Sequence, residues 1–286
     1  MIRVIFIWLS ILIFALTSFV RAWGYDGHRR INYIASKQLN GPFGHFLRQH
    51  SEPLKWYAAA PDYNKKIDPE EFHRHFIDAD HFDVYPFNKI SKNYDLFIET
   101  YGEEAAKKYG IAPWVIENTC KLIIDMMKQD RWDDAIYHMG TLGHYVADLH
   151  QPLHTILNYD GQFTGNDGVH FRWEERLVDK YISTINPIGE IERITNPWDY
   201  AMMIVRESFL VHQKILTADT KARRLLSKDQ VIALDSYAIL DFEEPYLDVL
   251  YEETESLLKD RLGRATVRLA SLWKYCWEEA GSPELP

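Results

Sequence analysis

The segment 144–174 reads HYVADLHQPLHTILNYDGQFTGNDGVHFRWE and contains two pairs of metal-binding residue types at helical spacing. His144 stands four residues before Asp148, and His170 stands four residues before Glu174. Because residues four apart lie on one face of a helix, with Cβ atoms roughly 5–6 Å apart, each pair can point at a single centre. Imidazole nitrogen and carboxylate oxygen are donors that zinc takes beside thiolate. The segment therefore predicts helices that present metal ligands.

A proline and a further histidine follow the first pair. Because proline has no N–H and clashes with the preceding turn, we expect the first helix to end or kink at Pro152 and to carry His154 toward a different centre. A single His–Asp pair at this spacing is more often a solvated hydrogen bond than a ligand pair. Here, however, five such residues are interleaved with apolar ones: Leu142, Val146, Leu149 and Leu153. Polar groups on a buried helix need partners, and this pattern indicates a metal.

Composition and charge limit the classes of partner. The chain of 286 residues is 47% hydrophobic and 14% aromatic, enough for a sizeable core in one large or two modest domains. Its formal charge of −10 disfavours long duplex nucleic acid, because an acidic surface repels polyanions. Cys120 and Cys276 fit no zinc–thiolate spacing, and the sequence leaves open whether they pair.

Residues 1–22 have the features of a secretory signal peptide. A basic residue precedes an apolar run, and Val20 and Ala22 are the small residues expected before a cleavage site at Trp23. The alternative is an uncleaved membrane anchor, but the run is short for a spanning helix of ~20 residues. We expect removal of this segment, export to the periplasm or the extracellular space, and a mature domain over 23–286 without a membrane span.

Cleavage before Trp23 would create a further metal ligand. A free terminal amine has a pKa of roughly 7.7–8.0, so it can lose its proton near neutrality and chelate a metal together with its own carbonyl oxygen. His28 follows five residues later, after Gly24 and Gly27, which permit a tight turn. By itself, His28 could equally cap or solvate the helix that is expected to begin near Gly27.

The segment 58–87 shows little regular periodicity and many polar side chains, which is typical of functional segments. Asp62 and His75 are its ligand candidates. On composition alone, His73 and His81 compete with His75.

The remaining sequence alternates helical patterns, and no run has the alternation of a strand. We expect two helices over 93–130, separated at Gly110, a central helix over 132–150 and another over 172–185. Aromatic and methionine stripes in three later segments are typical of core packing: 196–216, 236–242 and 243–280. The sequence predicts an all-α fold, a single-domain multi-helix bundle.

Taken together, these motifs resemble the superfamily that joins bacterial zinc-dependent phospholipases C with single-strand-specific zinc nucleases and 3′-nucleotidases. The shared motifs are an N-terminal Trp-Gly with a later His, an Asp before an HFxD segment, an HYxxDxxxPxH core, and an Asn before a final His and acid. The residues that carry them are Trp23, Gly24, His28, Asp62, His75, His144, Asp148, Pro152, His154, Asn166, His170 and Glu174. The resemblance extends to about residue 180.

The resemblance implies a cleft that holds three zinc ions. It places one zinc on Asp62, His75, His144 and Asp148, a second on the Trp23 amine and carbonyl, His28 and a bridging Asp148, and a third on His154, His170 and Glu174. The donor count agrees, because these residues are too many for one zinc, which is usually four-coordinate.

The same resemblance implies hydrolysis of phosphoric esters. Metals ~3.5–4 Å apart can bind a phosphoryl group, lower the pKa of a bridging water and stabilise the leaving oxygen. Asp62, which would orient the nucleophile, and Asp148, which would bridge two zincs, are the expected catalytic residues.

The substrate class is less well determined by the motifs. Glu174, where the nucleases carry Asp, and Tyr145 are similar to the phospholipase branch, and Lys65 stands where the nucleases have the planar fork of Arg. The QPLH run, and Phe76 with Asp78, are similar to the nuclease branch, in which an aromatic and an acid contact the base. Lys65, Phe76 and Asp78 are therefore the expected substrate-binding residues.

Lys65 and the acidic charge favour a phospholipase C-like esterase that acts on small or lipid phosphodiesters. A single-strand-specific nuclease or 3′-nucleotidase is the alternative. A non-catalytic, metal-stabilised secreted bundle is the second alternative, because metal binding couples to folding and ligands alone do not prove turnover.

Overall fold

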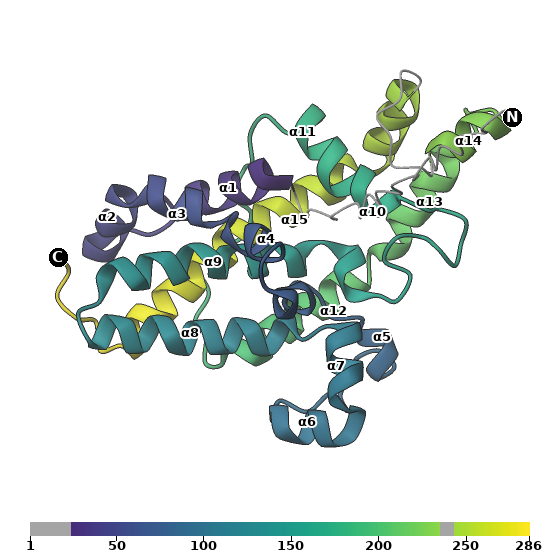
Figure 1. Ribbon diagram of the computed structural model, residues 1–286. Coiled ribbons are helices and arrows are strands. Elements are labelled where there is room, and N and C mark those ends of the chain that lie inside the picture. The colour runs from purple at the N-terminus through teal and green to yellow at the C-terminus, as the bar shows by residue number, and fades with distance from the viewer. Residues whose placement is uncertain (1–23, 235–242) are drawn as a thin grey trace, which may run out of the picture.

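The computed structural model describes residues 24–234 and 243–286, and the regular elements among them are all helical (Figure 1). The first half contains α1 (Gly24–Ala35), α2 (Gly41–Gln49), α3 (Ser51–Tyr57), α4 (Ala60–Asn64), the 3₁₀ turn η1 (Pro69–Arg74), α5 (Ala79–Phe82), α6 (Tyr94–Tyr101), α7 (Glu103–Tyr109) and α8 (Ala112–Lys128). The second half contains α9 (Trp132–His150), η2 (Pro152–Thr155), α10 (Val169–Phe171), the π-turn η3 (Arg172–Arg176), α11 (Leu177–Tyr181), α12 (Pro197–Phe209), α13 (His212–Arg223), α14 (Lys228–Leu234) and α15 (Glu243–Glu279).

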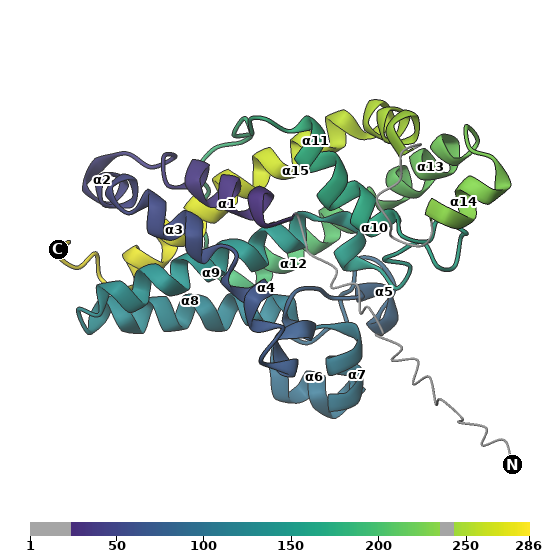
Figure 2. The ribbon, with the colours of Figure 1, turned by 45° about the horizontal axis from the view of Figure 1, so that its top comes forward.

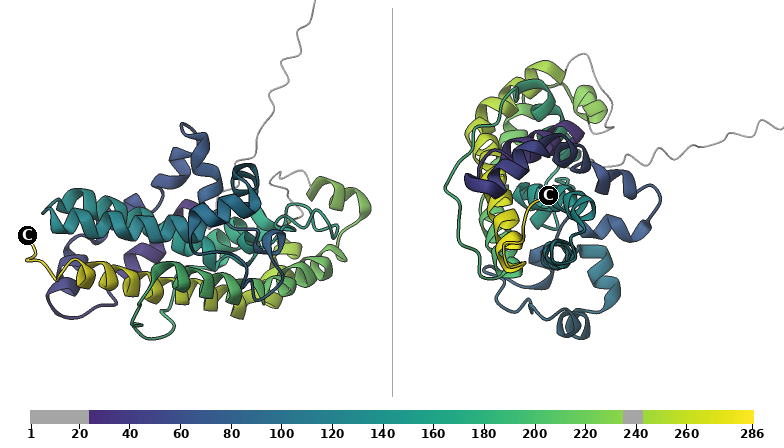
Figure 3. Two further views of the ribbon diagram at one scale, coloured as in Figure 1. Left: turned by 90° about the horizontal axis from the view of Figure 1, so that it is seen from below. Right: turned by 90° about the vertical axis from the view of Figure 1, so that its left-hand side faces the viewer.

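Helix α9 lies at the centre of the bundle. Every residue from Met139 to His150 is buried, and a helix that is buried on all sides must be surrounded by other elements. Helices α8, α12 and α15 pack along it, and α1 and α3 cover a further side. Figure 3 shows α12 and α15 running beside the α8–α9 pair, and Figure 2 shows α1 between α9 and α15.

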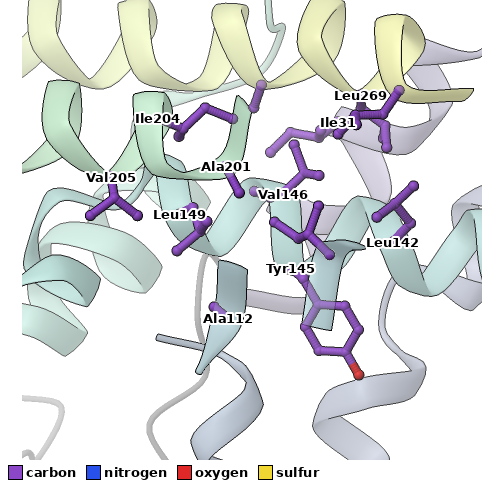
Figure 4. Packing of buried hydrophobic residues seen from close by; sticks show 14 of the residues in the cluster. Ile31, Ala112, Leu142, Tyr145, Val146, Leu149, Ala201, Ile204, Val205 and Leu269 are labelled. Atoms are coloured by element: carbon purple, nitrogen blue, oxygen red, sulfur yellow. The ribbon is translucent and has the colours of Figure 1, made fainter. Parts of the chain in front are cut away.

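Aliphatic side chains from four helices meet around α9 (Figure 4). The four apolar residues that the sequence placed beside the ligands all have no exposed surface: Leu142, Val146, Leu149 and Leu153. They contribute to a core shared with Ile31 of α1, Ile204 of α12 and Leu269 of α15. This apolar packing holds α9 rigidly, so the polar residues on the same helix are fixed in position.

The all-α prediction and the central helix over 132–150 are confirmed. The prediction of two helices over 93–130 is wrong, because Gly102, with a φ of 86°, separates α6 from α7 before Gly110 separates α7 from α8. The helix expected over 172–185 begins earlier, at Val169, passes through the π-turn and ends at Tyr181. The segment 196–216 likewise divides between α12 and α13.

Several expectations concern segments that the structure does not describe. The signal peptide 1–22, Trp23 and the whole pattern over 236–242 lie outside the described residues. Within the described ranges, no helix has the length and apolar character needed to cross a bilayer. Cys120 and Cys276, both inside those ranges, are buried and remain free thiols.

Candidate metal centre

Helix α9 supplies the first two ligand candidates. His144 and Asp148 lie one turn apart on α9, and both are fully buried. The helix ends at His150, as expected from Pro152, and the chain turns into η2, where the Gln151 side chain accepts a hydrogen bond from the Leu153 N–H. The turn carries His154 away from the helix line, as the sequence predicted.

Helix α1 brings His28 against α9 through an unusually close contact. A Cβ atom on Gly143 would lie 1.9 Å from Asn32 Oδ1, so only glycine permits this approach. The Asn32 amide donates to the carbonyls of Leu54 and Gly140, at 2.9 Å each, and joins α1 to α3 and α9. As a result, the His28 ring stacks on the ring of His144, with centroids 3.8 Å apart.

The loop before α10 brings in the last ligand candidates. Asn166, part of the motif noted in the sequence, is buried, and its amide donates to Asp219 Oδ2 at 2.7 Å and to the Leu216 carbonyl at 3.2 Å. These bonds fix the loop to α13. His170 and Glu174 then follow on consecutive turns, with His170 Nε2 3.0 Å from Glu174 Oε2.

The ligand candidates form three buried groups, each with ligand atoms within 4.8 Å of one another. We name these groups site A (Asp62, His75, His144), site B (His28, His144, Asp148) and site C (His154, His170, Glu174). Asp148 lies between them: its Oδ2 is 2.9 Å from His75 Nδ1, and its Oδ1 is 3.5 Å from His28 Nε2 and 3.9 Å from His154 Nδ1. The structure thus brings together all the sequence-predicted ligand residues that it describes, with His144 in reach of both site A and site B.

The hydrogen bonds around the histidines show that a cation fits these sites. His144 Nδ1 lies 2.7 Å from the Ala58 carbonyl and must donate to it, so Nε2 carries a bare lone pair. That lone pair faces Asp148 Oδ2 at 3.3 Å and Asp62 Oδ1 at 3.6 Å. Burial lowers the pKa of His144 well below its ordinary value, so the neutral ring is favoured. A lone pair that faces carboxylates is repulsive unless a cation lies between them.

Site C repeats this arrangement. His154 Nδ1 lies 3.2 Å from the His75 carbonyl, which leaves Nε2 unprotonated and 3.3 Å from Glu174 Oε2. Glu174 Oε1 and Asp62 Oδ2 are buried and accept no hydrogen bond from any described residue. Because unpaired buried carboxylate oxygens are costly, these atoms also fit a divalent metal whose preferred donors are nitrogen and oxygen.

Glu71 and Gln151 support the ligands from behind. Glu71 Oε1 lies 3.4 Å from His75 Nε2 and accepts a hydrogen bond from the Tyr145 hydroxyl at 2.5 Å. The Gln151 amide donates to Glu174 Oε2 at 2.9 Å. Neither supporting role was predicted from the sequence, although Glu71 precedes His75 by the same four-residue spacing that identified the ligand pairs.

A pocket opens beside sites A and C. Its lining consists of Lys65, Phe72, His75, Phe76, Asp78, Lys108, Leu153, His154, Tyr159 and His170. Lys65 Nζ lies 2.8 Å from Asp62 Oδ1. Burial raises the pKa of Asp78 to about 8, so this carboxyl is protonated at neutral pH. The pocket therefore places a cation, aromatic rings and a neutral acid beside the metal ligands.

The two histidines that competed with His75 lie outside the three groups. His81 is exposed and stacks on Tyr109, with ring centroids 3.5 Å apart. His73 is buried on η1, and its carbonyl accepts from the Ile111 N–H at 2.9 Å. Of the three, only His75 reaches the centre.

A family model described as S1/P1 nuclease matches residues 23–276. The chain belongs to the S1/P1 nuclease family. No curated protein sequence matches it at a significant level. Membership in this family makes the chain a zinc-dependent hydrolase that acts on phosphoester bonds. The family uses three zinc ions, and the three buried groups are clusters that could hold them. The predicted family, enzyme class and metal are confirmed.

Within the superfamily, the match favours the branch of single-strand-specific nucleases and 3′-nucleotidases, which was the alternative expected from the sequence. One of the features that suggested the phospholipase branch also has a structural explanation. Tyr145 is buried, and its hydroxyl donates to Glu71 rather than lining the pocket.

Proposed function

We propose that this S1/P1 family member is a single-strand-specific nuclease and 3′-nucleotidase. The observation that supports the proposal best is the match of the S1/P1 nuclease model over residues 23–276. The chemistry of the pocket agrees with it, because aromatic side chains and a neutral acid lie beside the metal ligands, where a nucleobase next to the scissile phosphate needs stacking and hydrogen bonding.

In this proposal, sites A, B and C each hold one zinc ion, and the Trp23 amine and carbonyl complete site B. Bound zinc supplies Lewis acidity to the phosphoryl oxygens and lowers the pKa of a coordinated water. Asp148 would contribute to both site A and site B, because its Oδ2 lies 2.9 Å from His75 Nδ1 and its Oδ1 lies 3.5 Å from His28 Nε2. Asp62, whose Oδ1 contacts the Lys65 ammonium, orients the attacking water.

Three pocket residues would bind the substrate. Lys65 is only 9% exposed at its side chain, and its positive charge faces the pocket where a phosphate would enter. Phe76 offers a ring for base stacking, and Phe72 packs edge-on against it with centroids 5.5 Å apart. Asp78, protonated at neutral pH, can donate a hydrogen bond to a base acceptor.

Substrate specificity is tested by three assays in the presence of zinc: nucleotide release from single-stranded DNA, phosphate release from a 3′-nucleotide, and p-nitrophenol release from p-nitrophenylphosphorylcholine. The proposal expects activity on the first two. Activity on the phosphorylcholine ester alone would contradict the nuclease proposal and indicate a phospholipase C-like esterase. Inactivity on all three, by protein that carries its zinc, would contradict both.

We also propose that the chain is exported and that cleavage before Trp23 releases the amine needed by site B. Small residues at Val20 and Ala22 and the preceding apolar run support this. Mass spectrometry of the exported protein should find Trp23 at its N-terminus. A mature chain that begins elsewhere would remove the amine from the metal centre.

A further inference from the structure

A continuous series of cationic and aromatic side chains runs across α1, α3 and α4. We name it the cation–aromatic ladder, and its residues in spatial order are Lys55, Trp56, Arg29, Tyr25, Tyr63 and Lys66. Lys55 Nζ lies 5.4 Å from the Trp56 ring centre, and the Arg29 guanidinium lies 4.3 Å from the same ring.

The ladder continues from Arg29 toward α4. The Arg29 guanidinium lies 5.8 Å from the Tyr25 ring, which stacks on Tyr63 with centroids 4.8 Å apart, and Lys66 Nζ lies 5.5 Å from the Tyr63 ring. At the other end, Lys55 also approaches Tyr33, whose ring carries Lys37 Nζ at 3.6 Å. Rings and positive charges therefore alternate along most of the series.

The ladder is accessible and adjoins the metal centre. Trp56 is 54% exposed and Tyr63 is 45% exposed, so both rings can accept a further stacking partner. Tyr63 directly follows Asp62, the buried site A residue, on the short helix α4. Figure 2 shows α4 beside α9, with α1 and α3 on the same side of the bundle, which places the ladder on the surface that leads away from the centre.

The segment that carries the ladder has a formal charge opposite to that of the whole chain. Residues 24–67 contain seven basic and three acidic residues, a formal charge of +4, whereas the complete chain carries −10. Of the acids, Asp62 faces the metal centre, Asp26 lies 3.5 Å from the Arg29 side chain and Glu52 lies 3.3 Å from Lys55. The segment that carries the ladder is thus basic within an acidic chain, and both acidic residues that lie next to the ladder's cations, Asp26 and Glu52, are exposed.

We infer that the cation–aromatic ladder binds the part of a single-stranded nucleic acid that extends beyond the catalytic pocket. A single strand alternates phosphates with unpaired bases, and proteins bind it with positive charge along the backbone and aromatic rings on which bases stack. An amphipathic membrane-binding surface, by contrast, gathers its apolar side chains on one side for insertion. The inference rests on the proposed nuclease function and deepens it, because it predicts that strand length, and not only the cleaved dinucleotide, contributes to recognition.

The test compares the zinc-loaded enzyme on two substrates, a dinucleotide and a single-stranded DNA of about 20 nucleotides, the second long enough to span a pocket and an adjoining surface. The readout is the ratio of kcat/KM on the long strand to kcat/KM on the dinucleotide. Trp56→Ala should lower this ratio by about tenfold, as expected for one lost base stack, whereas Trp56→Phe, which keeps a ring, should retain most of it. Zinc content and Tm confirm that each variant is folded.

The lysines are tested through salt dependence. The double variant Lys55→Ala/Lys66→Ala should lower the slope of log(kcat/KM) against log salt on the long strand by about 1.4, the effect of two lost phosphate contacts. The matched control Lys121→Ala/Lys128→Ala removes the same charge from exposed positions on α8 and should leave the slope unchanged.

Each outcome has a distinct meaning. An enzyme that cleaves neither substrate contradicts the proposed function itself. If the enzyme cleaves both substrates and the ratio of kcat/KM values is the same in the wild type and in Trp56→Ala, the ladder does not bind the strand. The proposed nuclease function is then unaffected. A third outcome is an unchanged ratio of kcat/KM values together with weaker binding of Trp56→Ala than of the wild type to phosphatidylserine vesicles in a co-sedimentation assay. This outcome contradicts strand binding and indicates that the ladder binds a membrane surface.

Discussion

The Lys65 ammonium lies 2.8 Å from Asp62 Oδ1, with both side chains almost fully buried at the edge of site A. The contact joins a residue expected to bind the phosphate to one expected to orient the nucleophile. It also shows that lysine at this position reaches the pocket without the planar fork of arginine.

Replacement of this charge should weaken the reaction. Lys65→Met keeps the length of the side chain but removes the positive charge near the developing negative charge on the phosphate, so we expect kcat/KM on a 3′-nucleotide to fall by roughly 10²-fold. Lys121→Met, at an exposed position on α8, is the control and should behave as wild type. Unchanged kcat/KM in Lys65→Met would remove Lys65 from the substrate site.

Glu71 should act on zinc affinity through His75. The Glu71 carboxylate faces His75 Nε2, where it orients the imidazole ring and raises the basicity of that ring. Glu71→Ala removes both effects and should weaken zinc binding by about 10–100-fold. Glu71→Gln, which keeps an acceptor oxygen, should lose less. Competition with a chromogenic chelator measures the change. The neighbouring Glu70→Ala, at an exposed position, is the control, and equal losses in both variants would contradict the assignment.

The pH dependence of substrate binding should report on Asp78. Burial raises the pKa of this carboxyl to about 8, so it donates a hydrogen bond below that pH and loses the donor when it ionises above it. We expect KM for a 3′-nucleotide to rise as the pH increases through about 8. Asp78→Asn keeps an N–H donor that does not titrate, and its KM should stay flat over this range. The same rise in the Asn variant would assign the titration to another group.

Removal of zinc should lower stability as well as activity. Ligand binding stabilises the native state by about 2.7 kcal/mol at a concentration of 100 Kd, and a domain of this size gains roughly 2–4 °C per kcal/mol. Complete chelation should therefore lower Tm by at least about 5 °C, and added zinc should restore it. Calorimetry with parallel metal analysis checks this. Retention of the full Tm after loss of all zinc would contradict this prediction, because zinc binding would then not stabilise the native state.

The sequence predicts the centre well where both partners lie within one helical turn, as for His144 with Asp148 and His170 with Glu174. It predicts less where the contact joins distant elements. The approach of Arg29 to Trp56 depends on the packing of α1 on α3, which no local pattern encodes. The break at Gly102 was missed because the helical periodicity of the segment continues on both sides of it, and the periodicity does not encode the positive φ that the glycine adopts.

The contact between Gly143 and Asn32 has a consequence for how this enzyme can change. Since even a methyl group at position 143 would collide with the Asn32 side chain, that side chain has to shift, away from its hydrogen bonds to the Leu54 and Gly140 carbonyls, before any other amino acid fits there. His28 sits one turn away from Asn32 on the same helix, so loss of the hydrogen bonds that join this helix to α3 and α9 would weaken the positioning of His28 in site B. In a saturation-mutagenesis screen that selects only for turnover, position 143 should thus accept nothing but glycine, although it touches neither metal nor substrate.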